Sequence, residues 1–185
     1  MIALKNIFYK KLMQEEFLKI LRTLKQNVFI MTSGTEGDRC AVTVSSVTSL
    51  SLEPPLIIVC INKNASMHKN LEKNKKFCLN LLNSNQKDLA NLCSGEDDGE
   101  KRFSQGEWSQ TEPVFLTNAQ SNIFCCIDEI FPFASHSLVI GKIFDLKHSG
   151  EKNPLIYQDG EYEYCLLYTS PSPRDRTRCR MPSSA

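Results

Sequence analysis

CAVTVSSVTSLSLEPPLIIVCI, residues 40–61, is the stretch that decides the predicted fold. Its first residues alternate between apolar and polar side chains and its last six are continuously apolar, so both ends predict β-strands. Pro54 and Pro55 interrupt the pattern, because proline lacks the backbone N–H that a strand ladder uses. We therefore expect two strands joined through a bend at the prolines.

The middle of this stretch carries more hydroxyl groups than an ordinary core strand buries. Residues 45–51 include Ser45, Ser46, Thr48, Ser49 and Ser51. A buried hydroxyl without a hydrogen-bond partner costs on the order of 1–3 kcal/mol. The segment is therefore either a solvated loop or a surface that hydrogen-bonds a polar ligand.

The flanking sequence predicts a mainly β protein. Apolar residues at helical spacing predict a helix over residues 13–26, and residues 28–32 predict a strand that forms a hairpin with the opening stretch. Further strands are expected at 76–82, 121–130, 137–146 and 154–157, and short helices at 66–74 and 85–92. Six or seven strands with two or three peripheral helices indicate a mainly antiparallel barrel.

Two connecting segments are expected to be irregular. Residues 94–108 are rich in glycine and acidic side chains and predict a mobile surface loop. Residues 131–136, FPFASH, are expected to form the loop between the last two long strands.

Length and composition exclude several classes of function. The chain has 185 residues, of which 41% are hydrophobic and 23% charged, which is ordinary for one globular domain. A net charge of +1 gives no electrostatic reason for nucleic-acid binding. No apolar run approaches the roughly 20 residues that a membrane helix needs. The lysines of the N-terminus follow its short apolar part, which does not suit a secretory signal, so we expect a cytoplasmic protein.

The eight cysteines and three histidines give no metal site by spacing. No cysteine pair has the CxxC spacing of a zinc site, and the cysteines in strand-like runs are expected to be buried, reduced thiols. His68 and His148 are expected to be exposed. His136 differs, because it opens a strand directly after an aromatic segment, and it is the candidate functional histidine.

The C-terminal segment, residues 165–185, does not share the pattern of the rest. It holds four arginines and one aspartate among prolines and serines, with no amphipathic period. One interpretation is a disordered basic tail. The other is that CLLYTSPSPRD is the translation of a sequencing adapter. Residues 1–164 are therefore taken as the domain, with a core of about 13–162, and no function is drawn from the tail.

At residues 43–61 the sequence resembles the signature of a known family. TVSSVTSLSLEPPLIIVCI is similar to the flavin reductase-like, FMN-binding split-barrel family, whose members read roughly T-x-S-S-F-T-S-V-S-L-D-P-P-L before an apolar strand. Val47 and Glu53 depart from the common Phe and Asp, and Ser135 replaces the Asp that usually precedes the histidine.

Further matches follow in the family's order and extend the resemblance over about residues 13–162. They are Asn64-Ala65-Ser66, the strand at 77–82 (F-x-x-N-x-L), Arg102-Phe103 with Pro113-Val114, His136 with Gly141 (H-x-L-x-x-G), and Pro154 to Tyr157 (PLxY). The resemblance implies an antiparallel Greek-key split β-barrel and a homodimer with flavin near the subunit interface.

The resemblance also implies a reaction and a site. The reaction is hydride transfer from NADH or NADPH to N5 of FMN or FAD, and the reduced flavin can serve a partner monooxygenase. His136 would lie beside the nicotinamide as the catalytic residue. The cofactor-binding residues would be Thr43, Val44, Ser45, Ser46, Val47, Thr48, Ser49, Asn64, Ala65, Ser66 and Phe103.

The residue chemistry is compatible with this site. Hydroxyls along one bent strand would bind the polar edges of a flavin, and so would not remain buried and unpaired. Ser66, read as the N-cap of a short helix, and Asn64 would receive the phosphate. Hydride transfer needs neither a nucleophile nor a metal from the protein. Two alternatives stay open: a flavin-binding protein without turnover, and a split-barrel relative that uses haem or a deazaflavin.

Overall fold

A seven-stranded antiparallel sheet forms the centre of the protein, whose computed structural model describes residues 2–95 and 99–164. Its strand order is β3-β2-β6-β7-β8-β5-β4, with non-consecutive Greek-key neighbours at β2–β6 and β5–β8. The strands are β2 (Phe29–Ser33), β3 (Cys40–Val44), β4 (Val47–Leu52), β5 (Pro55–Asn62), β6 (Lys76–Leu81), β7 (Ser121–Phe133) and β8 (His136–His148).

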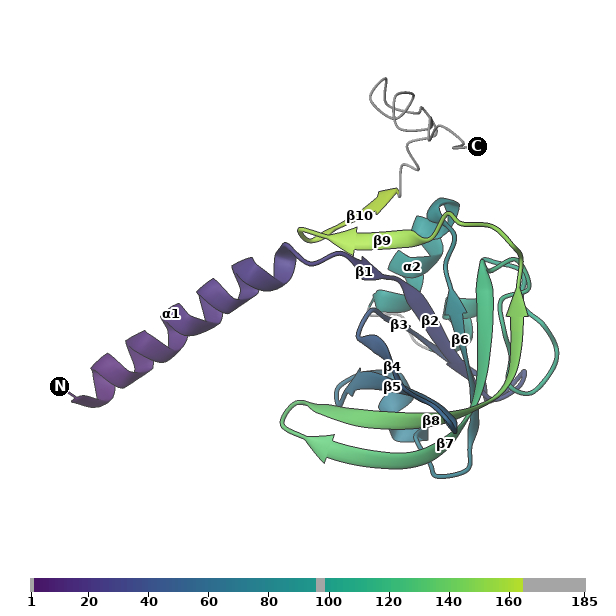
Figure 1. Cartoon of the computed structure of the whole chain (residues 1–185), viewed down its shortest axis with the longest axis horizontal. Helices are drawn as coiled ribbons and strands as arrows, with labels where there is room; N and C mark the ends of the chain where they lie inside the picture. The colour runs from purple at the N-terminus through teal and green to yellow at the C-terminus, as the bar shows by residue number, and fades with distance from the viewer. Residues whose placement is uncertain (1, 96–98, 165–185) are drawn as a thin grey trace, which may run out of the picture.

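The two edge strands of this sheet, β3 and β4, are consecutive in sequence and separated by Ser45 and Ser46. The sheet must therefore curl until its edges approach each other, which Figure 1 shows as an incompletely closed barrel. The fold predicted from the sequence, a mainly β split barrel, is confirmed. The expected bend at the prolines is a tight connection between β4 and β5 with a cis peptide bond before Pro54.

A smaller sheet and the helices surround the barrel. The second sheet pairs β1 (Gln26–Asn27), β9 (Leu155–Gln158) and β10 (Glu161–Tyr164), all antiparallel. The helices are α1 (Ile2–Arg22), α2 (Lys87–Ser94) and the 3-10 turns η1 (Ser66–Asn70), η2 (Ser84–Gln86) and η3 (Gly99–Phe103).

Strand β10 was not expected from the sequence. Asp159 and Gly160 have positive φ angles of 52° and 84° and form the two-residue turn between β9 and β10. An Asp-Gly pair is a strong hairpin signal, so the strand could have been predicted from the sequence.

Two apolar clusters pack on opposite faces of β2, which explains why its side chains are all buried. Phe29 and Met31 lie in the barrel interior, together with Phe77 of β6. Ile30 points to the other side, where α2, η3 and β9 cover the sheet. Strand β3, which carries the candidate site, is thereby fixed against a strand that is packed on both faces.

Helix α1 differs from the prediction in its bounds and in its packing. It runs Ile2–Arg22 rather than 13–26. Its predicted apolar stripe is not buried: Phe17 and Ile20 are 60% and 62% exposed. Figure 1 shows the helix projecting away from the barrel. The helical period in the sequence therefore predicted the helix correctly, but it did not predict that the apolar stripe is exposed.

Both segments expected to be irregular are partly regular. Residues 131–136 were predicted as a loop, but β7 and β8 extend through them and pair Phe133 with His136 across a turn at Ala134-Ser135. Residues 94–108 were predicted as a mobile surface loop. In the described part of that segment, η3 buries Arg102 and Phe103.

Six cysteines lie in the described residues, and all six are free thiols. Of the cysteines in strand-like runs, Cys40, Cys78 and Cys125 are buried as predicted, whereas Cys60 and Cys126 are only half-buried; Cys93 of α2 is buried as well. Burial raises the pKa of both Cys93 and Cys125 to about 12, so these thiols stay protonated and unreactive at neutral pH. Within residues 2–95 and 99–164, no helix has the length and apolarity needed to cross a membrane. The predicted tail, residues 165–185, lies outside the described residues.

Candidate functional site

A polar groove surrounds the link between β3 and β4. Four adjoining cavities, of about 490, 410, 180 and 230 Å³, share walls at Thr43, Ser45 and Ser46. We call these cavities together the link groove. The hydroxyl-rich segment identified in the sequence therefore lines concave surface and is not merely a solvated loop.

The backbone of the link is held in place from both sides. Ser45 O accepts a hydrogen bond from Val47 N–H at 2.9 Å, and Ser46 O accepts one from Cys60 N–H at 3.1 Å. The side chain of Thr43 is also engaged, because its Oγ1 donates to Ala90 O of α2 at 2.7 Å. Thr43 thus ties the groove wall to α2 while its oxygen remains able to accept a further bond.

Two cationic side chains line the largest cavity of the link groove, and Lys25 lines the 410 Å³ cavity. The largest cavity is lined by Lys69 of η1 and Arg102 of η3, with Asn64 and Ser66 beside them. Arg102 is only 6% exposed, and its guanidinium donates to Ala41 O at 2.5 Å and Gly95 O at 2.9 Å. Arg102 therefore joins β3 to the segment that follows α2. Lys69 is exposed.

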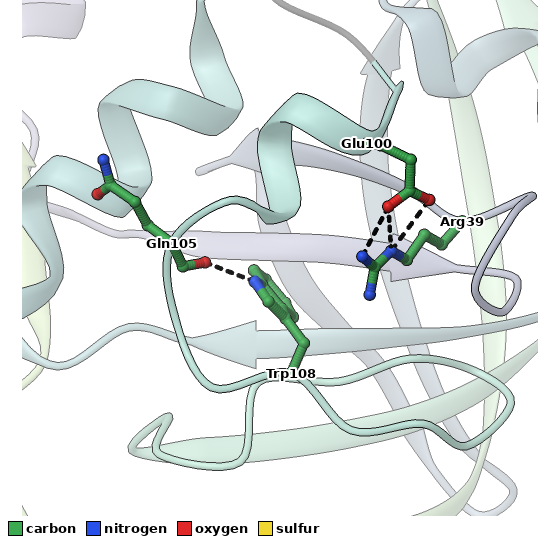
Figure 2. A network of polar contacts seen from close by, with 4 residues as sticks. All are labelled: Arg39, Glu100, Gln105 and Trp108. Atoms are coloured by element: carbon green, nitrogen blue, oxygen red, sulfur yellow. Dashed lines mark hydrogen bonds and ion pairs between the residues drawn. The ribbon is translucent and has the colours of Figure 1, made fainter.

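An ion pair holds η3, and with it Arg102, against the end of β3. Figure 2 shows Arg39 Nε and Nη2 donating to the Glu100 carboxylate, at distances of 2.6 to 3.1 Å. The guanidinium of Arg39 also lies 4.3 Å from the centre of the Phe103 ring. These hydrogen bonds from Arg39 lower the pKa of the Glu100 carboxyl, so the ion pair is fully formed at neutral pH and is lost as the pH falls through that pKa.

Phe103 was predicted to contact the cofactor, but the structure places it in the second apolar cluster. Its ring packs edge-on against Trp108, with centroids 5.0 Å apart. The Trp108 indole N–H donates to Gln105 O at 2.6 Å, as Figure 2 shows. Phe103 therefore supports the groove wall from behind.

One of the three histidines, His136, lines the link groove. His136 is exposed and lines the 180 Å³ cavity, and its Nδ1 lies 2.9 Å from Ser135 Oγ. Ser135, which stands where the family commonly has Asp, thus still provides a hydrogen-bond partner for the ring. The prediction that His68 is exposed was wrong: it is half-buried, and its Nε2 lies 2.8 Å from Oγ of the fully buried Ser137. His148 is exposed as predicted.

Most of the predicted site residues come together in the link groove. Those in its walls are Thr43, Val44, Ser45, Ser46, Val47, Thr48, Asn64, Ala65, Ser66 and His136. Ser49 instead lies exposed on β4, and Phe103 lies behind the wall. Ser66 is not an N-cap as expected, because η1 begins at Ser66 itself and Ala65 holds the N-cap position without a side-chain bond.

Several wall residues were not assigned to the site from the sequence. They include Lys25, Asn62, Lys69, Ser94, Gly95, Arg102, Tyr157 and Tyr162. Lys69 had a cue in its position three residues after Ser66, which brings the two side chains to one side of a helical turn. Among the described residues, no three His, Cys, Asp or Glu side chains are grouped as metal ligands.

The donor set of the link groove fits a flavin nucleotide. Hydroxyls and amides along the link match the carbonyl and N–H edges of the ring, and the cations that line the largest cavity match a phosphate. The sequence profile of the flavin reductase like domain matches residues 21–165. The chain belongs to the flavin reductase-like family.

Relatives and solved structures of this family resemble the chain over most of its length. The reductase component of an FADH(2)-dependent resorcinol hydroxylase from Rhizobium sp. is 30% identical, over 80% of this chain and 85% of that protein. An FMN reductase (NADH), RutF, of Pseudomonas syringae is 28% identical, over 82% and 86%. A crystal structure described as a flavin reductase from Haemophilus somnus has a TM-score of 0.76 at 32% identity, over 81% and 97%.

Proposed function

We propose that this protein reduces FMN or FAD with NADH or NADPH. The observation that carries the proposal is the link groove itself, in which the family's hydroxyl-rich motif lies next to three cationic side chains, Lys69 and Arg102 in the largest cavity and Lys25 in the 410 Å³ cavity. A bound flavin supplies the hydride-accepting chemistry. The chain has only to bind it, orient the nicotinamide against it and limit the access of water.

The activity is tested by mixing the purified protein with NADH or NADPH in the presence and absence of FMN or FAD. We expect nicotinamide oxidation that depends on flavin in at least one of the four combinations. If none of them supports oxidation above the protein-free rate, the proposed function is wrong.

Lys69 is the residue we assign to the flavin phosphate. Lys69 is exposed and lines the largest cavity together with Asn64 and Ser66, and a charge-assisted hydrogen bond is worth about 1.5–3 kcal/mol. Lys69→Gln is therefore expected to raise the Kd for FMN by roughly 10- to 100-fold. The Kd for riboflavin, which has no phosphate, should change little, and flavin fluorescence titration measures both.

Lys87→Gln is the matched control, because Lys87 is an exposed lysine of α2 that lines none of the four cavities. An equal loss of FMN and riboflavin affinity in Lys69→Gln, or no loss in either, would remove Lys69 from the phosphate site.

His136 is the group we assign to the nicotinamide. It lines the cavity that also contains Ser45 and Ser46, and Ser135 fixes its ring through Nδ1. Its other ring nitrogen is then available to hydrogen-bond the nicotinamide amide. This is a positioning contribution to hydride transfer, so loss of His136 should slow the reaction and not abolish it.

We infer a homodimer from the packing of α1. Helices in proteins gain most of their stability by packing an apolar face, yet the side chains described for α1 are exposed, including the apolar stripe. The last turn of α1 is held to the β9–β10 turn by a hydrogen bond from Asp159 N–H to Arg22 O. The long β7–β8 hairpin also exposes Phe131 and Phe133 near its tip. A second copy that covers these surfaces accounts for both.

The double variant Phe17→Glu/Ile20→Glu is expected to convert the dimer to a monomer in sedimentation velocity. Lys19→Glu changes the net charge equally on the opposite face of α1 and should leave the dimer intact. A wild-type protein that sediments as a monomer at micromolar concentration would contradict the assignment.

The remaining parts of the proposal follow from these assignments. The reduced flavin leaves to serve a partner monooxygenase, which is supported by the name of the Rhizobium relative, the reductase component of an FADH(2)-dependent hydroxylase. The functional domain ends near residue 164, which is supported by the end of the family match at residue 165. A cytoplasmic location is supported by the six free thiols of the described residues, since a reducing compartment preserves them.

A further inference from the structure

Two tyrosines of the β9–β10 hairpin form an aromatic corner beside the link groove. Tyr157 and Tyr162 are cross-strand partners, held opposite each other by the turn at Asp159-Gly160. Their ring centroids lie 5.3 Å apart at an interplanar angle of 61°. Tyr162 packs against the second apolar cluster, whereas Tyr157 is 38% exposed and keeps aromatic surface open to a ligand.

This corner forms one wall of the 230 Å³ cavity of the link groove. The other wall residues are Val28, Thr43, Ser45 and Ser94. Thr43 and Ser94 also line the largest cavity, and Ser45 also lines the cavity that contains His136. A ligand in the groove can therefore extend into the tyrosine corner without leaving the protein surface.

The chemistry of this cavity suits a neutral planar ring. The residues that line it carry no charged side chain, so it does not attract a phosphate. Its volume is below the roughly 300 Å³ at which pockets for whole small molecules begin, so it suits one part of a larger ligand. Aromatic faces stack on nucleobases, and serine or threonine hydroxyls bond their polar edges.

We propose that Tyr157 and Tyr162 form a subsite for the adenine ring of a dinucleotide bound in the link groove. The adenine can belong to FAD or to the nicotinamide dinucleotide, and both present the same ring to the tyrosines. The inference rests on the proposed function, because it assumes that such nucleotides occupy the groove. It adds a determinant of nucleotide choice that the hydroxyl-rich motif does not contain.

The test is Tyr157→Leu, which keeps apolar bulk and removes the aromatic face. Kd values are measured for FAD and FMN, and for NADH and reduced nicotinamide mononucleotide; the second ligand of each pair lacks adenine. The preference is the ratio of the two Kd values within a pair. Loss of base-on-aromatic stacking predicts that this ratio falls roughly 5- to 100-fold for one of the two pairs. The pair that changes identifies the source of the adenine.

Tyr157→Phe is the matched control and should keep the wild-type preference, because it retains the ring. If Tyr157→Leu leaves both preferences within twofold of wild type, the subsite does not exist. These are binding ratios, so they remain informative whether or not the protein turns over. A wild-type protein that binds these nucleotides without reducing flavin would contradict the proposed function and leave the subsite standing.

Discussion

Asn80→Leu is expected to destabilise the protein by about 2–4 kcal/mol, since buried groups lose hydrogen bonds at about 1–3 kcal/mol each. Asn80 is fully buried in β6. Its Nδ2 donates to Ile30 O at 2.8 Å and to Thr32 Oγ1 at 3.1 Å. Its Oδ1 accepts from Leu116 N–H at 2.8 Å and from Asn122 Nδ2 at 2.9 Å. Two of these four partners, Thr32 Oγ1 and Asn122 Nδ2, keep a second hydrogen bond and contribute less. Leucine fills a similar volume but satisfies none of these groups.

The measurement is urea unfolding followed by circular dichroism. Asn85→Leu is the control, because Asn85 is exposed in η2, where a substitution usually changes stability by no more than about 0.5 kcal/mol. A loss below about 1 kcal/mol for Asn80→Leu would mean that water or relaxation of the backbone replaces the network. Since the network joins β2 and β6 to the segment at Leu116, flavin affinity should fall only where the fold itself is lost.

Gly141→Ala is expected to destabilise the protein by about 1–3 kcal/mol through overpacking. A Cβ added at Gly141 of β8 would lie 2.5 Å from Phe77 Cζ and 3.1 Å from Cys125 Cβ. Both neighbours are fully buried inside the barrel, so neither has room to move away. The glycine of the H-x-L-x-x-G motif is therefore required by close packing.

A double-mutant cycle separates this clash from other effects of the substitution. Phe77→Leu removes the atoms that the new methyl group meets, so Gly141→Ala should cost clearly less in that background than in the wild type. Chemical denaturation of the four proteins gives the coupling energy. Strict additivity of the two substitutions would show that Phe77 is not what excludes a side chain at position 141.

The hairpin of β2 and β3 and the strand nature of the opening stretch were predictable from residue pattern alone, because alternation and β-branched residues act locally. The strand pairing that closes the barrel was not. The number of strands indicated a barrel, but local pattern does not encode which distant strands pair, such as β5 with β8. The family resemblance supplied it instead.

The site residues at the link between β3 and β4 were predictable from the sequence, whereas those that other elements contribute were not. Ser45 and Ser46 stood out because hydroxyls are unusual within a strand. Arg102 was matched to a family motif but not assigned to the site, because it lies in an acidic, glycine-bearing segment. The carbonyls of Ala41 and Gly95 to which it donates are brought to it only by the folded chain. Tyr162 reaches the groove through β10, which required recognition of the Asp-Gly turn.

The most direct test of the central claim is anaerobic. The protein is mixed with FMN or FAD, NADH or NADPH is added stepwise, and the flavin absorption band is recorded. The structure predicts that flavin absorption bleaches with one equivalent of nicotinamide oxidised per flavin reduced, much faster than without protein. A protein that binds flavin and leaves it oxidised under these conditions, or that takes up haem or a deazaflavin and no flavin, would contradict the account.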